Sequence, residues 1–206
     1  MQKFVILSAI LTMFALAGCS GSKEDKASPT FDEVLQTRRS IRAYDATKKI
    51  SKEEVREVIA AALEAPSWIN FEPSKYYVAI SEDKLAAVKE LVGERNKRNV
   101  ANAPVLIVST YEQGKSGFMP DGQQLNEIGD GWGAYDNGLS NAFLILKARA
   151  MGFDTLIMGM RDADALRQLF GIPSNETVMA VIALGYRAEK SRRPERRSVD
   201  EVTRFF

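Results

Sequence analysis

The sequence predicts an α+β fold in which a central mixed or antiparallel sheet is flanked by helices. Segments with the 3.6-residue periodicity of amphipathic helices mix irregularly with short apolar segments rich in β-branched residues. No regular strand–helix–strand repeat is visible, which argues against a doubly wound parallel sheet. The segment 177–184 is almost unbroken in its apolar character and therefore predicts an interior strand, buried on both faces.

The first 19 residues have the features of a signal peptide. Lys3 gives a positive start, and residues 4–15 are almost continuously apolar but fewer than the about 20 residues that a spanning helix needs. The small residues that end at Cys19 resemble a bacterial lipobox, so we expect a lipid-anchored protein of the cell envelope, on its periplasmic or surface face. An ordinary secretory signal with another cleavage site, or an uncleaved anchor, is the alternative. We expect a flexible polar linker over residues 20–29 and one domain over residues 30–206.

The composition excludes several classes of catalytic site. The chain has no histidine and one cysteine, which rules out Ser-His-Asp triads, Cys-His dyads and histidine zinc sites. We therefore expect no metal centre. The formal net charge of +1 argues against nucleic acid as a main partner. Chemistry must come from a bound cofactor or from carboxylates.

Two capping boxes predict the first two helices. Thr30 and Glu33 have the spacing in which each side chain bonds the other residue's backbone N–H, which predicts a short helix through about Gln36. Residues 51–54 repeat the pattern ahead of an apolar stripe, and Pro66 ends that second helix.

The remaining elements follow from periodicity and glycine punctuation. We expect strands over residues 75–80, 104–110, 155–158 and 177–184, and helices over residues 85–92, 136–151 and 164–170, the last two ended by Gly152 and Gly171. The polar stretch 111–133 holds six of the fourteen glycines and predicts a long loop. Loops of this length inside compact domains are usually functional or disordered.

Two arginine clusters lie near opposite ends of the domain. The first is Arg38-Arg39-Ser40-Ile41-Arg42, and the second is the run 192–197, which contains four arginines. Guanidinium groups and hydroxyls suit a phosphate or an anionic ring. The clusters could converge on one dianion, although either alone could be a solvated loop.

Further segments give these clusters a context. Four further segments follow the first cluster along the chain: the turn Ala65-Pro66-Ser67-Trp68-Ile69-Asn70, the pair Asn96 and Asn102, Met158-Gly159, and Gly185-Tyr186. Their order and separations are those found in the FMN-dependent nitroreductase family. From about Phe31 to the C-terminus the chain resembles that family. The resemblance implies a nitroreductase-like fold, an intertwined homodimer and FMN as the cofactor. For the stretch 111–133 it implies a substrate lid, with an idle insertion as the alternative.

The resemblance also assigns candidate cofactor-binding residues. Arg38, with its neighbour Arg39, and Ser40 match the phosphate and ribityl site, joined by Arg197, or by Arg196 if the register shifts by one. Arg42 matches the position beside N1 and O2 of the ring, where negative charge accumulates on reduction. A surface ion pair of Arg42 with Asp45 is the alternative.

The other implied contacts involve the flavin ring. Asn96 matches the residue at the pyrimidine edge of the ring, and Asn99 stands where many members of the family have lysine. Gly159 matches a glycine whose backbone N–H would face N5 of the ring. Met158 stands where many members have glutamate, just before that glycine. Ser67, Trp68 and Asn70 match a turn that touches the partner subunit's flavin. Trp68 could equally be an interface plug.

The activity implied is flavin-borne oxidoreduction, with no side chain as a catalytic group. A donor would reduce FMN, and a nitroaromatic, quinone or similar acceptor would then reoxidise it in a ping-pong cycle. The donor would be NAD(P)H or, outside the cytoplasm, an alternative such as a quinol. Phe118 and Trp132 could stack on an aromatic acceptor. The alternatives are other flavin chemistry on the same fold, or a non-enzymatic lipoprotein scaffold, which Asn99, Met158 and Ser74 favour.

Overall fold

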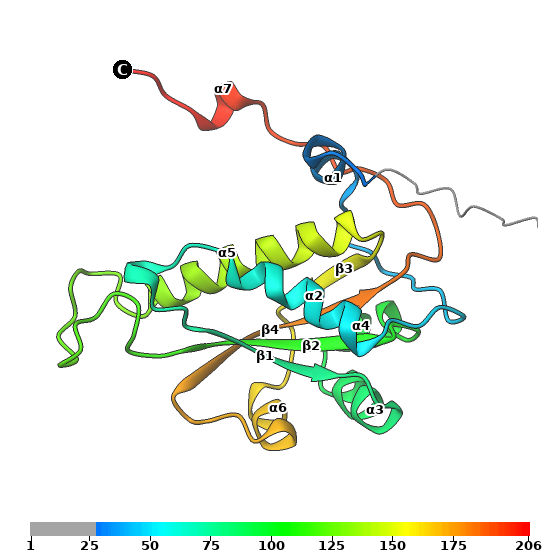
Figure 1. Cartoon of the computed structure of the whole chain (residues 1–206), viewed down its shortest axis with the longest axis horizontal. Coiled ribbons are helices and arrows are strands. Elements are labelled where there is room, and N and C mark those ends of the chain that lie inside the picture. Colours follow the sequence, from blue (N-terminus) through cyan, green and yellow to red (C-terminus); the bar gives the residue numbers. More distant parts are fainter. Residues whose placement is uncertain (1–27) are drawn as a thin grey trace, which may run out of the picture.

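The computed structural model of the protein describes residues 28–206 (Figure 1). The predicted lipid attachment at Cys19 and most of the predicted linker lie outside these residues. Between residues 28 and 206, no helix is both long and apolar enough to cross a membrane.

A four-stranded antiparallel sheet forms the centre of the domain. Its strands are β1 (Ser74–Ala79), β2 (Val105–Glu112), β3 (Asp154–Met158) and β4 (Glu176–Gly185), in the order β1-β2-β4-β3. The α+β prediction is confirmed, and the four strands of this sheet pair antiparallel throughout. β4 lies between β2 and β3, as its unbroken apolar character predicts.

Helices cover both faces of this sheet. The helices of residues 28–206 are α1 (Phe31–Thr37), α2 (Lys52–Leu63), α3 (Glu82–Glu90), α4 (Glu94–Asn99), α5 (Gly131–Ala150), α6 (Ala163–Phe170) and α7 (Val199–Val202), with a 3₁₀ turn η1 (Trp68–Asn70), and four of them, α2, α3, α5 and α6, pack on the sheet. The capping boxes at Thr30 and Ser51 are present, as predicted. The sequence did not predict α4, because its six residues are polar and show no apolar stripe.

The long helix α5 begins five residues before its predicted start. Gly131 and Gly133 suggested a loop, yet both lie in the first turn of α5. A Cβ atom at Gly133 would lie 2.5 Å from the ring of Tyr111 on β2. This glycine therefore permits close helix–strand packing rather than a bend, and the loop shortens to residues 113–130.

The sheet is buried on both sides between two layers of helices. Figure 1 shows α2 and α5 on one face, and α3 and α6 on the other. Val105 and Ile107 of β2 pack in the α2–α5 core, whereas the alternate residues Leu106 and Val108 pack in the opposite core. Because β2 serves both cores, its eight residues are almost all buried.

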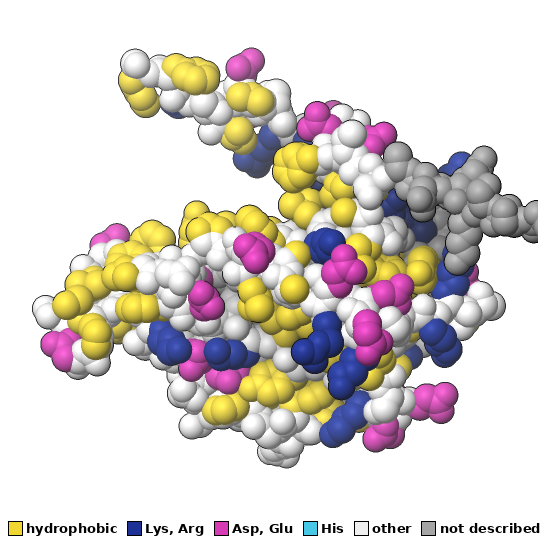
Figure 2. All heavy atoms as spheres, in the orientation of Figure 1, with side chains coloured by type: hydrophobic (Ala, Val, Ile, Leu, Met, Phe, Trp, Pro, Cys, Tyr) yellow, Lys and Arg dark blue, Asp and Glu magenta, His cyan; other side chains and the backbone are white. Residues whose placement is uncertain are grey.

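The C-terminal segment leaves the sheet and returns past the N-terminal helix. After β4 the chain runs beside α1 and then projects from the body as an arm that contains α7 (Figure 1). The arm exposes four large apolar side chains, Val199, Val202, Phe205 and Phe206. Figure 2 shows hydrophobic side chains gathered on this arm and along the facing edge of the domain.

Candidate flavin site

The two arginine clusters lie side by side in the structure. Together they line a cavity of about 180 Å³, here called the arginine cavity. Its walls are Arg38, Arg39, Ser40 and Arg42 from the segment after α1, and Ser191, Arg192, Pro194 and Arg196 from the segment after β4. Of the two residues implied by alternative registers, Arg196 lines the cavity and Arg197 does not.

Backbone pairing fixes the first wall against the sheet. Ser40 forms an isolated parallel bridge with Thr155 of β3, and the Ile41 N–H donates to the Thr155 carbonyl at 3.0 Å. Tyr44 pairs with Arg187 just beyond the end of β4. Since Ile41 and Tyr44 are buried, the arginines between and before them are presented on an anchored segment.

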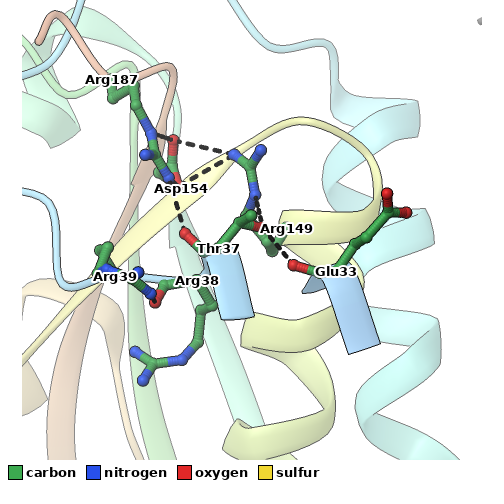
Figure 3. Close-up of polar contacts among 7 residues, drawn as sticks. All are labelled: Glu33, Thr37, Arg38, Arg39, Arg149, Asp154 and Arg187. Atoms are coloured by element: carbon green, nitrogen blue, oxygen red, sulfur yellow. Dashed lines mark hydrogen bonds and ion pairs between the residues drawn. The ribbon is translucent and has the colours of Figure 1, made fainter. Parts of the chain in front are cut away.

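A buried carboxylate joins α1 to the sheet beneath this wall. Asp154, 3% exposed, accepts from Arg187 Nε at 2.6 Å and lies 3.3 Å from Arg149 Nη1 at the end of α5. Arg149 also donates to Thr37 Oγ1 at 3.2 Å (Figure 3). The hydrogen bond to Asp154 raises the pKa of Arg187. The sequence did not predict this cluster, because a single aspartate at the start of a strand forms no recognisable pattern.

Arg39 has an excess of positive charge around it. Its Nη1 donates to the Arg38 carbonyl at 2.6 Å, while its buried Nε has no hydrogen-bond partner among residues 28–206. Burial, then the neighbouring charges of Arg193 and Arg38, lower the pKa of Arg39. Figure 3 shows the Arg38 guanidinium directed away from Asp154. An unpartnered buried donor among like charges fits an anionic group such as a phosphate.

Arg42 is exposed and donates to the Ser40 carbonyl at 3.2 Å. Asp45, its alternative partner, instead accepts from Thr47 and lies 3.9 Å from Lys48. Within residues 28–206, no ion pair joins Arg42 to Asp45. The guanidinium is therefore available at the cavity rim.

The arginine cavity is too small for a whole flavin. Ligand pockets usually measure about 300–1,000 Å³, so about 180 Å³ suits a phosphate and part of its chain. FMN therefore fits this site in part: the charge is in place, whereas one chain encloses little space for the ring.

The residues implied at the ring lie on α4 and at the end of β3. Asn99 donates to Asn96 at 3.4 Å. The Gly93 N–H, just before α4, donates to the Met160 carbonyl at 3.0 Å, which holds α4 beside the end of β3. Met158 is buried, whereas Gly159 is exposed and an added Cβ would meet nothing within 4 Å.

The implied partner-facing turn is remote from the arginine cavity. The Trp68 N–H donates to Asp136 at 3.0 Å in the first turns of α5, whereas Arg149 in its last turn contacts α1. The thirteen residue-to-residue steps from Asp136 to Arg149 span about 20 Å of helix. One chain does not bring Ser67, Trp68 and Asn70 to its own arginine cavity.

The two candidate substrate aromatics have different environments. Phe118 lines a second cavity of about 310 Å³ with Phe71, Lys115 and Met119. Trp132 packs against Trp68, with ring centroids 4.7 Å apart, and donates to Asn126 at 3.0 Å. Only Phe118 is thus presented to a cavity.

Comparison with known proteins covers most of the chain. The model of the Nitroreductase family matches residues 35–186. YdgI of Bacillus subtilis, which carries the name of an NAD(P)H nitroreductase, is 26% identical over 85% of this chain and 97% of its own. A Staphylococcus epidermidis structure described as an NAD(P)H:FMN oxidoreductase is 25% identical, with a TM-score of 0.77 over 86% of this chain and 96% of its own. A protein of Exiguobacterium sibiricum solved with FMN is 24% identical, with a TM-score of 0.76 over 86% and 98%.

Proposed function

Because this chain belongs to the nitroreductase family, a family of FMN-dependent oxidoreductases, we propose that it reduces nitroaromatic, quinone or similar acceptors by a ping-pong cycle. The observation that carries the proposal is the meeting of both arginine clusters around one cavity. When bound, FMN supplies the electron transfer chemistry, taking electrons from a donor and passing them to the acceptor.

We assign phosphate binding to Arg38, Ser40 and Arg196, with Arg39 donating from the buried side. These residues converge from the two walls of the arginine cavity. A charge-assisted hydrogen bond contributes about 1.5–3 kcal/mol, so each arginine is expected to change FMN affinity about ten-fold or more. Arg197 is only a secondary candidate for phosphate binding, because it does not line the cavity.

We assign charge stabilisation at the ring to Arg42. Its exposed guanidinium has no carboxylate partner within the described chain, so it can stabilise negative charge that develops on reduction and raise the reduction potential. Asn96 would hold the pyrimidine edge, and the Gly159 backbone N–H would donate toward the reacting edge. With Asn99 in place of lysine and Met158 in place of glutamate, Arg42 carries more of this role.

We propose that two copies complete the site. The arginine cavity encloses only part of a flavin, and the Ser67–Asn70 turn lies about 20 Å away along α5. An apolar groove lined by Phe31, Val34, Phe143 and Leu146 lies beneath the projecting arm. We propose that a second copy buries this groove and that its turn then approaches the first copy's cavity. Sedimentation equilibrium is expected to give a dimer, and a monomer that retains FMN and turnover would contradict this.

We propose NAD(P)H as the electron donor, in keeping with the names of YdgI and the Staphylococcus protein. The signal-like N-terminus supports a second proposal, that lipid attachment at Cys19 anchors the protein in the cell envelope. On the outer side of that membrane a quinol is the alternative donor, since NAD(P)H is kept inside. Mass spectrometry of the mature N-terminus tests the anchor.

A visible spectrum during anaerobic titration tests the central proposal. We expect a yellow protein whose flavin band bleaches with NADH, NADPH or a soluble quinol and returns on adding a nitroaromatic or a quinone. Bleaching identifies the donor, and an acceptor panel separates nitro and quinone reduction from dehalogenation or ring desaturation. Colourless protein that also fails to bind added FMN would overturn the assignment and support the scaffold alternative.

A further inference from the structure

The turn that carries Trp68 and Asn70 is the most strained backbone in the described chain. Between residues 28 and 206, Ile69, Asn70 and Glu72 are the only residues other than glycine with positive φ, at 47°, 56° and 47°. The left-handed region is costly for β-branched residues such as isoleucine. Such strain persists only where the surrounding structure holds it, and it clusters at functional sites.

The turn is held by several hydrogen bonds of its own. The Phe71 N–H donates to the Trp68 carbonyl at 2.9 Å, and the Glu72 N–H donates to Ser67 Oγ at 3.0 Å. The Asn70 side chain donates to Glu72 at 2.9 Å. These contacts lie within the turn and do not tie it to the rest of the molecule.

One buried carboxylate connects the turn to the rest of the molecule. Asp136, 2% exposed on α5, accepts from the Trp68 N–H at 3.0 Å through Oδ2. The same oxygen accepts from Ser116 Oγ of loop 113–130 at 2.6 Å. Both donors are uncharged, and within the described residues Asp136 forms no ion pair. One oxygen of Asp136 is therefore shared by a donor of the turn and a donor of the loop.

The indole rings bring the same two segments together again. Trp68 packs on Trp132 of α5, and Trp132 donates to Asn126 in loop 113–130. A Cβ at Gly117 of the loop would lie 2.9 Å from the Trp132 ring, so loop and indole are in close contact. Two independent sets of contacts thus join the strained turn to the loop.

We propose that Asp136 is a positioning residue that fixes the strained turn and loop 113–130 to each other, so that a change in the loop shifts the turn. Its consequence for catalysis rests on the proposed function, in which this turn reaches the flavin of a second copy. The loop that would cover the acceptor then also sets the position of Trp68 and Asn70.

Hydrogen exchange of the full chain tests the coupling without needing flavin. Ser116→Ala removes the loop's bond to Asp136 but touches no atom of the turn, and we expect exchange of the Trp68 to Glu72 amides to rise about ten-fold or more. Ser109→Ala is the matched control: Ser109 is equally buried and donates to Asn137 and Asn141 of the same helix at 3.1 and 3.0 Å, but not to Asp136. Unchanged exchange in Ser116→Ala, or an equal rise in the control, would overturn the proposal.

A second pair of variants distinguishes positioning from general stability. Asp136→Asn keeps an acceptor oxygen and is expected to retain much of the turn's protection, whereas Asp136→Ala loses it. In flavin-loaded protein, Ser116→Ala is expected to raise the acceptor KM several-fold with little change in kcat, because the loop and the turn that would face the acceptor lose their common anchor. Equal protection in Asp136→Asn and Asp136→Ala would contradict the role of the oxygen. Absence of flavin binding would instead remove the proposed function and leave the exchange result standing.

Discussion

The two ends of α5 each carry a buried carboxylate, but the donors around the two carboxylates differ in charge. At its C-terminal end, Asp154 is shared by Arg187 and Arg149, and the adjacent cavity still carries further arginines with no carboxylate. At its N-terminal end, Asp136 is a carboxylate with two neutral donors. The C-terminal end of α5 thus has more cationic donors than carboxylates, which suits a bound anion. At the N-terminal end the polar groups bond to one another and hold the strained turn.

The largest expected effect on stability comes from removing each of the two carboxylates. Asp154→Ala leaves Arg187 and Arg149 without their carboxylate partner and is expected to lower the free energy of unfolding by about 3 kcal/mol. This value is at the lower end of the range for broken buried ion pairs, because both guanidinium groups are partly exposed. Asp136→Ala removes two bonds from neutral donors and should cost about 1–3 kcal/mol. Urea unfolding measures both.

The conservative variants Asp154→Asn and Asp136→Asn serve as controls. Asparagine keeps one acceptor oxygen but removes the charge, so the Asp154 variant is expected to remain the more destabilised of the two. The contrast fails if Asp136→Asn costs as much as Asp154→Asn, since the charge would then matter equally at both ends.

The next test concerns ligand binding at the arginine end. Arg38→Ala is expected to weaken FMN binding about ten-fold or more through loss of a charge-assisted bond, with little change in stability. Arg56→Ala, an exposed arginine of α2 outside the cavity, is the matched control. Fluorescence titration of FMN measures both, and equal losses would mean that the cavity is not the phosphate site.

A glycine substitution sharpens the ring assignment. Gly159→Ala has free space for its methyl group in the chain, so stability is expected to stay within about 0.5 kcal/mol. FMN binding should nevertheless weaken if the ring lies against this backbone. Gly138→Ala on α5, also without close neighbours, should raise stability by roughly 0.5–1 kcal/mol and leave FMN affinity unchanged. Normal FMN affinity in Gly159→Ala would argue against a close ring approach.

The smallest expected effect is the acid dependence at the start of loop 113–130. Although burial opposes it, hydrogen bonds from Lys115 and Lys75 lower the pKa of Glu112. Because the pKa is lowered in the folded state, the stabilisation is present above the ordinary carboxyl pKa and is lost as pH falls through the lowered value. With partly exposed lysines it amounts to about 0.5 kcal/mol. Urea midpoints at several pH values should show a shallower acid slope for Glu112→Gln than for the parent chain.

Local signals in the sequence predicted most of the fold. Capping boxes set the starts of α1 and α2, and the alternating or unbroken apolar runs marked the strands. The predicted start of α5 was wrong because two glycines typical of loops instead permit close packing, Gly131 against Ile128 and Gly133 against Tyr111. α4 was missed because a six-residue polar helix lacks periodicity.

The candidate site was predictable where it depends on residue type and not where it depends on tertiary pairing. Clusters of arginine are visible in the sequence, and so is their suitability for an anion. The roles of Asp154 and Asp136 are not, because each acts through partners that are distant in the chain, such as Arg187 and Ser116. The resemblance supplied the partner-facing assignment of Trp68, which no local pattern contains.

The walls of the arginine cavity come from the first and last parts of the domain to leave the ribosome. Residues 38–42 precede every strand, and residues 191–196 follow the last one. A nascent chain that has completed β4 can already form its sheet, yet it has only half of the anion site. Loading of the cofactor at the proposed site must therefore wait until residues 191–196 have been made, and a chain truncated soon after Ala188 would keep its sheet while losing one wall of the proposed phosphate site.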